Sequence, residues 1–373
     1  MKLFVVAGES SGDALGGALL SELGGMTKLD LCGVGGPLME AQGLRSLFPM
    51  EELSVMGLAE IIPRYPALRR RMVQTADAAI AARPDILLTI DSPDFGLRVA
   101  RRVRAARPDQ RTVHYVAPSV WAWRPGRAAH MAEVIDHVLA LLPFEPPYME
   151  AAGMGCDFVA HPIVSRSPLP EAAVAAFRDA HSRGRPILAV LPGSRRSEIG
   201  RLAPVFGEAL RGLDVTPVVV AAPNKEALIA EATAGWPVSP VVIPGSDLSQ
   251  KRAAFAAAGA AIAASGTVSL ELAQARTPMA IAYDMAPLSR FIMRRLLRVQ
   301  TVTLVNLVSE TQAVPEFLGE RCRPELIRNA VRDMLRTGAP EQLDAMAVTM
   351  ERLGEGGPPP ARRAAKAVLR VSA

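Results

Sequence analysis

The feature that most constrains this chain is a repeated alternation of short apolar runs with longer helix-like segments. Each run ends in Gly, Pro, Ser or Asp before the next helix-like segment, which is typical of parallel β-strands joined by crossover helices. This pattern predicts an α/β fold with two series of strands. The first series is predicted at 3–7, 30–32, 86–90, 112–116, 137–141 and 157–159. The second is predicted at 187–191, 216–221, 240–243, 260–264 and 279–282.

The break between the two series predicts two domains. The chain has 373 residues, which exceeds the roughly 100–200 residues of one typical domain. A stretch at 162–186 mixes Pro-rich linker with one amphipathic helix and separates the series. We therefore expect an N-terminal domain at 1–165, a C-terminal domain at 166–345 and a terminal helix or tail at 346–373.

Composition narrows the class of protein. Half of the residues are hydrophobic, which excludes a disordered chain. The formal net charge of +5 suggests an anionic partner, and nucleic acid, phosphorylated metabolites and anionic lipid all remain open. The three cysteines form no CxxC pair, so neither a disulfide framework nor a Cys-based zinc site is predicted. The chain shows no signal-peptide pattern and no apolar run of about 18 residues, so we expect a cytoplasmic protein.

The first predicted strand runs directly into the sequence GESSGD, which begins at Gly8. Small residues such as Ser11 and Gly12 leave the backbone N–H groups of a helix start free to hold an anion or sugar hydroxyls. A tight turn capped by Ser11 or Asp13 explains the same residues. Glu9 favours the ligand-binding interpretation, because a carboxylate at the carboxyl end of a strand lies where open α/β sheets bind ligands.

Asp91 ends the apolar run at 86–90 and precedes Pro93. A carboxyl that emerges from a hydrophobic strand can have its pKa raised by desolvation toward that of a general base. The alternative is a helix cap, with Pro93 in the first helical turn. We interpret Asp91 as functional and Asp94 as the N-terminal charge of the following helix.

An aromatic cluster follows the next strand. Residues 114–123 contain a His and two of the three Trp residues, in a chain whose aromatic content is 5%. Exposed aromatic side chains often receive sugar rings or bases. Core packing explains Trp121 equally well, and the sequence does not decide between the two interpretations.

Two turns of the second series suit a phosphate. The first contains Arg195, whose guanidinium can neutralise a diphosphate through two hydrogen bonds, although no Walker sequence occurs. The second contains Ser265, Gly266 and Thr267, with a helix cap and amides that can meet phosphate. Glu271 lies about one helical turn after Thr267 and suits the two hydroxyls of a ribose. Solvent-facing arginines on a structural turn are the alternative, but the combination favours a sugar nucleotide.

These sequences together resemble the lipid-A-disaccharide synthase family over most of the chain. The matching sequence motifs, in chain order, are GESSGD, IDSPDF, HYVAPSVWAWRPGR, LPFE, LPGSRRSEI and SGTVSLELA. The resemblance implies a GT-B glycosyltransferase fold, with two Rossmann-like domains facing across a cleft and the last helix returning to the N-terminal domain. It also implies inverting transfer of 2,3-diacylglucosamine from UDP-2,3-diacylglucosamine to 2,3-diacylglucosamine 1-phosphate, which gives a β-1,6-linked disaccharide and UDP.

The resemblance assigns roles to the candidate residues. Asp91 becomes the candidate base for the acceptor 6-hydroxyl, and Glu9 an acceptor-side or alternative carboxylate. No metal and no cofactor is expected, because Arg195 and a helix N-terminus can stabilise the leaving diphosphate. The residues expected to contact substrate or UDP are Gly8, Ser11, Gly12, Arg195, Ser265, Gly266, Thr267, Glu271 and Asn306.

Both implied substrates carry acyl chains, so an anionic membrane surface is an expected partner, at the inner face of the inner membrane. Two segments that mix apolar and basic residues suit this contact, 55–72 and 287–298. A buried face with solvated arginines is the favoured explanation of either segment taken alone. Nucleic acid is no longer expected as a partner, and a homo-oligomer remains open.

Three alternative functions fit parts of the same sequence. Another UDP-sugar enzyme of the same architecture, such as an N-acetylglucosaminyl transferase or a UDP-sugar 2-epimerase, would share the sequence SGT with its downstream Glu. A non-catalytic nucleotide- or lipid-binding module would keep the glycine turns without the carboxylates. An NAD-dependent oxidoreductase is poorly supported, because the first turn is not GxGxxG.

Overall fold

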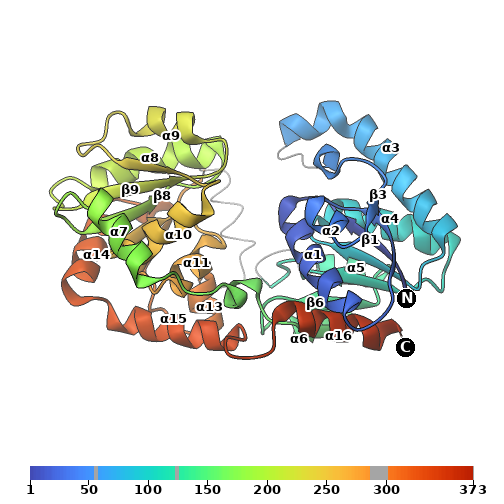
Figure 1. Cartoon of the computed structure of the whole chain (residues 1–373). Helices are drawn as coiled ribbons and strands as arrows, with labels where there is room; N and C mark the ends of the chain where they lie inside the picture. Colours follow the sequence, from blue (N-terminus) through green and yellow to red (C-terminus); the bar gives the residue numbers. More distant parts are fainter. Residues whose placement is uncertain (54–57, 122–125, 286–300, 373) are drawn as a thin grey trace. The chain divides into compact units, whose positions relative to one another are not determined.

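The computed structural model of the chain describes residues 1–53, 58–121, 126–285 and 301–372. The chain divides into two compact units (Figure 1). Unit 1 comprises Met1–Ser165 with Gly356–Ala373, and unit 2 comprises Arg166–Glu355.

Unit 1 is built on a parallel sheet of seven strands in the order β3-β2-β1-β4-β5-β6-β7. The central strand β4 is buried along its whole length, because helices cover both faces of the sheet. The strands are β1 (Lys2–Ala7), β2 (Asp30–Val34), β3 (Arg45–Ser46), β4 (Ile86–Ile90), β5 (Thr112–Tyr115), β6 (His137–Ala140) and β7 (Gly155–Phe158).

The helices of unit 1 pack on the two faces of this sheet through two separate apolar cores. One core joins the sheet to α1 (Ser10–Gly24), α2 (Pro37–Glu40) and α16 (Pro360–Ser372). The other joins it to α3 (Leu58–Ala82), α4 (Pro93–Ala106), α5 (Gly126–Ala132) and α6 (Pro146–Glu150). Short 3-10 turns, η1 (Met50–Leu53) and η2 (Pro162–Ser165), complete the unit.

Unit 2 contains a parallel sheet of six strands in the order β10-β9-β8-β11-β12-β13. The strands are β8 (Ile187–Leu191), β9 (Thr216–Ala221), β10 (Val241–Pro244), β11 (Ala260–Ala263), β12 (Met279–Tyr283) and β13 (Glu316–Leu318). One face is covered by α8 (Arg196–Ala209), α9 (Glu226–Thr233) and α14 (Pro324–Thr337). On the other face lie α10 (Leu248–Ala257) and α11 (Val268–Gln274), packed against α7 (Glu171–His181), α13 (Leu304–Ser309) and α15 (Pro340–Arg352); η3 (Gly319–Arg321) follows β13.

All eleven predicted strands are confirmed, with ends that differ by at most two residues. The sequence prediction missed β3 and β13, which are two and three residues long and lie at sheet edges. Strands this short contain no apolar run that the sequence could show. Each also lies at a sheet edge, where only one side pairs with another strand.

The C-terminal tail begins at residue 356 instead of at the expected residue 346. Met346 and Met350 are buried in unit 2, and the Thr349 hydroxyl donates to the Val305 carbonyl at 3.2 Å. Helix α15 therefore belongs to unit 2 as far as its end. The next helix, α16, packs beside α1 in unit 1 through buried residues such as Val368.

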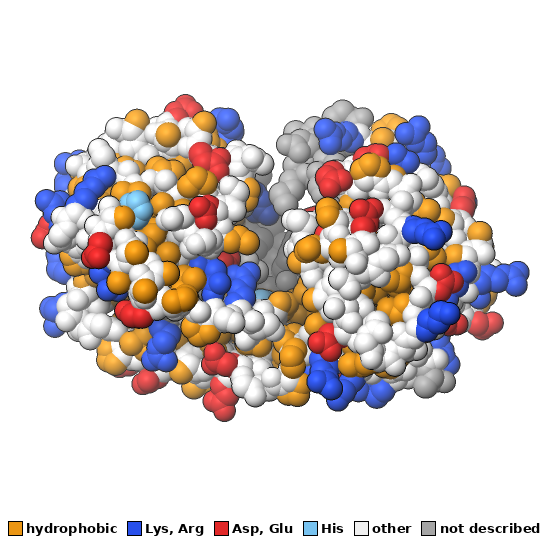
Figure 2. Space-filling view, in the orientation of Figure 1, with side chains coloured by type: hydrophobic (Ala, Val, Ile, Leu, Met, Phe, Trp, Pro, Cys, Tyr) orange, Lys and Arg blue, Asp and Glu red, His pale blue; other side chains and the backbone are white. Residues whose placement is uncertain are grey.

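The surface of the described residues carries both signs of charge. Lys and Arg side chains alternate with Asp, Glu and uncharged side chains over the visible face (Figure 2). The excess of positive charge is therefore spread over that face in small groups. No described helix is both long and apolar enough to cross a membrane.

Candidate active site

The turn after β1 meets the turn after β4 in unit 1. The two strands are parallel neighbours, so their carboxyl ends lie at the same edge of the sheet. A Cβ atom added to Gly8 would lie 3.0 Å from the Ser92 hydroxyl, and one added to Gly12 would lie 3.3 Å from the Ile90 carbonyl oxygen. The glycines of GESSGD thus allow α1 to approach the end of β4 closely.

Asp91 occupies a strained position at this edge. Its φ is +52°, and Ser92 follows with φ +39°, so two successive residues with side chains are left-handed. Such conformations cost about 1–3 kcal/mol each and persist where the surrounding structure enforces them. The Ser11 hydroxyl donates to Asp91 Oδ2 at 3.0 Å, and the Ser92 amide donates to Oδ1 at 2.9 Å. Both carboxylate oxygens are thereby oriented.

Glu9 lies beside Asp91 and completes a pair of carboxyl groups. Partial burial raises the pKa of Glu9, repulsion from Asp91 raises it further, and a hydrogen bond with Ser92 lowers it in part. The structure therefore brings together Gly8, Glu9, Ser11 and Asp91, as expected from the sequence. A pair of neighbouring carboxyls with different surroundings suits the acceptance and release of a proton.

The other two carboxylates near these turns have different roles. Asp13 is buried and accepts hydrogen bonds of 3.0 Å from the backbone amides of Gly36, Leu38 and Met39. It therefore fixes the start of α2 and is not free for chemistry. Asp94 has a side chain that is 95% exposed and pairs with Arg127 at 3.2 Å.

A cavity of about 650 Å³ opens beside this carboxyl pair in unit 1. Its lining combines apolar side chains, the carboxylates and two arginines that come from α3 and α4. The lining residues are Glu9, Leu53, Tyr65, Leu68, Arg69, Met72, Asp91, Ser92, Pro93, Asp94, Phe95 and Arg98. Such a lining suits a ligand that has both a polar sugar and a hydrocarbon chain.

Arg71 of the predicted basic segment is engaged within the protein. Its Nε and Nη2 atoms donate to the two carboxylate oxygens of Glu52 at 2.7 and 2.6 Å, and its guanidinium lies 4.5 Å from the centre of the Phe48 ring. Arg71 is therefore a structural residue. Residues 55–57 of the same segment and all of 287–298 lie outside the described residues.

His114 is fully buried, and Trp121 is half-buried and packed within unit 1. The Trp121 Nε1–H donates to Glu145 Oε1 at 3.4 Å, and the Trp121 ring packs edge-on against Phe144 at 5.2 Å. The buried Glu145 also accepts from the Leu142 amide at 3.0 Å, and burial raises its pKa to about 7. Burial and, next, Arg127 lower the pKa of His114 to about 4. Core packing is thus the better interpretation of both aromatic residues.

A cavity of about 370 Å³ in unit 2 collects the predicted nucleotide-binding residues. It lies at the carboxyl ends of β8, β9, β10 and β11, where parallel α/β sheets bind ligands. The predicted residues in its lining are Arg195, Ser265, Gly266, Thr267 and Glu271. Residues that are about 70 positions apart in the sequence therefore meet in one site.

The turn at Arg195 is organised around Glu198. The backbone amides of Ser194 and Arg195 both donate to Glu198 Oε2, at 3.1 and 3.2 Å. The other oxygen of Glu198 accepts from Arg195 Nη1 at 2.8 Å. Gly193 has a φ of +108°, and a Cβ atom there would lie 2.7 Å from Glu198. Glu198 thus orients the Arg195 side chain, which remains 70% exposed.

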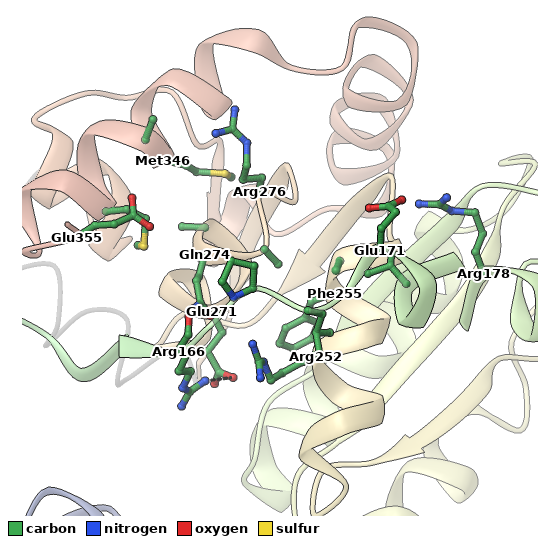
Figure 3. Close-up of a pocket in the computed structure, with 18 residues that line it drawn as sticks. Arg166, Glu171, Arg178, Arg252, Phe255, Glu271, Gln274, Arg276, Met346 and Glu355 are labelled. Carbon is green, nitrogen blue, oxygen red and sulfur yellow. Dashed lines mark hydrogen bonds and ion pairs between the residues drawn. The ribbon is translucent and has the colours of Figure 1, made fainter. Parts of the chain in front are cut away.

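Glu271 is held between two cations. Lys251 Nζ lies 2.9 Å from its carboxylate, and Arg166 Nη1 lies 3.2 Å from Oε2. Figure 3 shows Arg166 next to Glu271 in the lining of a neighbouring cavity of about 470 Å³, which shares Glu271 with the nucleotide cavity. These two cations fix the orientation of the Glu271 carboxylate. A carboxylate that accepts hydrogen bonds from two ribose hydroxyls needs such a fixed orientation. Thr267 precedes α11 without a side-chain capping bond, contrary to the expected cap.

Asn306 does not belong to this cavity lining. It is buried, its Oδ1 accepts from the Val314 amide at 2.9 Å, and its Nδ2 donates to the Val314 carbonyl at 2.9 Å. Its amide group is therefore used to hold the chain before β13. Glu316 fixes the same region by accepting from the amides of Val302 and Thr303 at 3.0 and 2.8 Å.

Sequence reasoning missed several residues of the two sites. Lys251 comes from α10, and Arg127 comes from α5 and reaches Asp94. Tyr283 ends β12 near Glu198 and Arg195, and burial, with the Glu198 charge second, raises its pKa. The role of Glu198 could have been predicted from the sequence, because a Glu at the third position of a helix commonly accepts a hydrogen bond from the N-cap amide. The sequence contains no comparable pattern for Lys251 or Arg127.

The two parallel sheets, with ligand-suited turns at the carboxyl edge of each, are the architecture of the GT-B fold class. UDP-GlcNAc 2-epimerase from Neisseria meningitidis, solved with UDP-GlcNAc, shares this fold with a TM-score of 0.65, 11% identity and 99% of each chain covered. The calicheamicin glycosyltransferase CalG4 gives a TM-score of 0.58 and 18% identity over 99% of this chain and 97% of that chain.

Sequence comparison narrows this class to one family. The sequence model of the family described as "Lipid-A-disaccharide synthetase" matches residues 3–366. The lipid-A-disaccharide synthase of Ruegeria pomeroyi is 56% identical over 383 aligned residues, which cover 99% of this chain and 95% of that protein. The chain belongs to the lipid-A-disaccharide synthetase family. The predicted family and fold class are thereby confirmed.

Proposed function

We propose that this protein transfers 2,3-diacylglucosamine from UDP-2,3-diacylglucosamine to 2,3-diacylglucosamine 1-phosphate. The family match over residues 3–366 is the observation that carries this function. The site geometry agrees with it, because unit 1 presents paired carboxyls beside an apolar cavity and unit 2 presents a nucleotide-suited cavity. The products are the β-1,6-linked disaccharide 1-phosphate and UDP.

Asp91 is proposed as the general base. Its carboxylate accepts the proton of the acceptor 6-hydroxyl while that oxygen forms a bond to C1 of the donor sugar. The bond between C1 and the diphosphate oxygen breaks in the same step, and its electron pair leaves with UDP. The configuration at C1 inverts, so no covalent enzyme intermediate is needed. Ser11 and the Ser92 amide support this role by fixing both oxygens of Asp91.

Arg195 and Glu271 are proposed to hold the donor. Arg195 offers a guanidinium to the diphosphate, where it stabilises the negative charge that develops on the leaving group. Glu271 accepts hydrogen bonds from the ribose hydroxyls, and Lys251 holds its carboxylate in place. Ser265, Gly266 and Thr267 line the same cavity and contribute backbone amides.

We infer that the protein works at the inner face of the inner membrane as a peripheral protein. The inference rests on the acyl chains of both proposed substrates and on the cavity beside Asp91, where Leu68 and Met72 lie next to Arg69 and Arg98. Apolar side chains receive hydrocarbon, and exposed arginines add attraction to anionic lipid.

An assay with each substrate alone and with both together tests the proposed function. Purified protein is incubated with the donor alone, the acceptor alone and both together, and UDP and disaccharide are quantified by mass spectrometry. We expect one UDP for each disaccharide, and only when both substrates are present. Conversion of the donor sugar without an acceptor would indicate an epimerase or a hydrolase and would contradict the proposal.

A further inference from the structure

A second cavity of about 290 Å³ in unit 1 is also lined by Asp91. It is formed where β4 and β5 end, and α5 contributes Arg127. Asp91 and Pro93 line both this cavity and the larger apolar one. Both cavities therefore adjoin the proposed base.

The backbone around this smaller cavity is held in uncommon conformations. Val116, which follows β5, has a φ of +86°, a conformation that β-branched residues rarely adopt. Its amide donates to the Leu139 carbonyl at 3.0 Å, as the Asp91 amide does to the Tyr115 carbonyl at 2.9 Å. Both strand ends are thus fixed by bonds to neighbouring strands. Strain that is maintained at two adjacent strand ends is typical of functional sites.

Arg127 gives the smaller cavity its positive charge. It is the only cationic residue in the lining, and Asp91 is the only anionic one, among the residues that the structure describes. The Arg127 side chain is 33% exposed, and its Nη2 lies 3.2 Å from Asp94 Oδ1. An ion pair with so exposed a carboxylate is weak. Within the described part of the chain, Nε and Nη1 of Arg127 make no hydrogen bond, so they are available to an anion.

We propose that this cavity binds the phosphate group of the acceptor and that Arg127 is its ligand. The proposal rests on the proposed function and adds the orientation of the acceptor. In a glucosamine 1-phosphate, C1 and C5 both flank the ring oxygen, so the phosphate lies within one sugar ring of the 6-hydroxyl. The acyl chains extend from C2 and C3, away from C6. An acceptor with its 6-hydroxyl at Asp91 then directs its phosphate to Arg127 and its acyl chains to the larger cavity.

The test compares two acceptors that differ only in the phosphate, 2,3-diacylglucosamine 1-phosphate and 2,3-diacylglucosamine. We expect wild-type protein to prefer the phosphorylated acceptor in kcat/KM. Arg127→Gln should lower kcat/KM for that acceptor about ten- to a hundredfold, in keeping with the loss of a charge-assisted hydrogen bond. It should leave the unphosphorylated acceptor and the KM for the donor unchanged. Arg127→Lys should restore part of the preference, because a cation returns without the bidentate geometry.

Two further arginines on α4 serve as matched controls. Arg101 pairs with an exposed carboxylate, Glu133, at 3.2 Å and lines neither cavity, so Arg101→Gln should keep the full preference. Arg98 lines the larger cavity. A preference that persists in Arg127→Gln, or that disappears in Arg98→Gln instead, would overturn the proposal.

A binding measurement separates this inference from the proposed reaction. Calorimetry with the phosphorylated acceptor in detergent micelles should show weaker binding to Arg127→Gln than to wild type, with UDP binding equal in both. Wild-type protein that binds this acceptor through Arg127 but forms no disaccharide would contradict the proposed function alone. Equal acceptor binding by wild type and variant would contradict the phosphate site, whatever the activity.

Discussion

At the scale of single residues, the four carboxylates near the turns after β1 and β4 are distinguished by their partners. Asp13 is occupied by three backbone amides, and Asp94 is exposed and paired with Arg127. Glu9 and Asp91 remain at the sheet edge, where both line the larger cavity and Asp91 also lines the smaller one. Their position relative to hydrogen-bond donors, more than their distance from a strand end in the sequence, decides which one can act on a substrate.

Replacement of the proposed base, Asp91, should slow the transfer reaction. Asp91→Asn keeps the shape of the side chain and an oxygen for the Ser11 hydroxyl, but it cannot accept a proton. We expect kcat to fall by about 10²–10⁴-fold, the usual contribution of general base catalysis. UDP binding, measured by calorimetry, should stay at the wild-type value because the nucleotide cavity lies in unit 2. Near-normal turnover by Asp91→Asn would exclude Asp91 as base.

The buried Glu145 leads to a prediction about stability. Its pKa in the folded protein is about 7, above the ordinary value of 4.5, because burial disfavours the charged form. Between pH 4.5 and about pH 7, Glu145 is therefore protonated in the folded protein but ionised in the unfolded chain. Its contribution to the stability of the folded state falls as the pH rises through this range. Glu145→Gln should remove this pH dependence and raise the unfolding free energy at pH 8 by about 1–3 kcal/mol.

Urea unfolding between pH 4 and pH 8 measures this effect. Glu133 provides the control, because it is exposed and paired with Arg101 and His130. Glu133→Gln should leave the pH dependence between 5 and 8 as in wild type. A pH profile for Glu145→Gln that runs parallel to wild type would show that Glu145 does not titrate in this range.

At the scale of elements, the turn between β8 and α8 shows how a helix start is shaped for a ligand. Glu198 reaches back from the first turn of α8 and accepts from two amides of the preceding turn. Gly193 makes room for this contact with its positive φ. The result is a turn whose backbone amides are occupied by Glu198, so the Arg195 guanidinium is the group that this turn offers to the proposed donor.

A pair of glycine substitutions tests this turn. Gly193→Ala requires a left-handed alanine and places a Cβ atom 2.7 Å from Glu198, so we expect a loss of about 1–3 kcal/mol of stability and weaker UDP binding. Gly200→Ala lies in the interior of α8 with open space around it, so we expect a gain of about 0.5–1 kcal/mol and unchanged UDP binding. Urea unfolding and calorimetry measure both. Equal effects of the two substitutions would contradict a special role of the turn.

At the scale of the whole molecule, the sequence predicted the fold well because apolar runs are local signals. Asp91 and Glu271 could be proposed from the sequence because they lie directly after a strand or in the first turn of a helix. The hydrogen bonds of Asn306 could not be predicted, because its partner, Val314, lies on another segment whose approach the sequence does not reveal. Lys251 and Arg127 were missed for the same reason, since each reaches its carboxylate from a separate helix. Residue roles that depend on contacts between elements required the structure.

Membrane association is a prediction for the whole molecule. The protein should sediment with vesicles that contain anionic lipid, and the bound fraction should fall as salt rises. Replacing Arg69 and Arg98 by Gln should weaken binding by about 1 kcal/mol for each arginine. Replacing Arg101 and Arg102, which pair with Glu133 and Asp77, provides a control with the same change in charge. Equal losses in the two double variants would indicate a general charge effect.

The most direct measurement for the central claim is the structure of the product, determined by NMR after wild-type protein has consumed both substrates. Base catalysis by Asp91 with departure of UDP in one step predicts a β anomeric configuration and a bond to the acceptor C6. An α-linked disaccharide, a bond at another position, or free diacylglucosamine in place of disaccharide would contradict it.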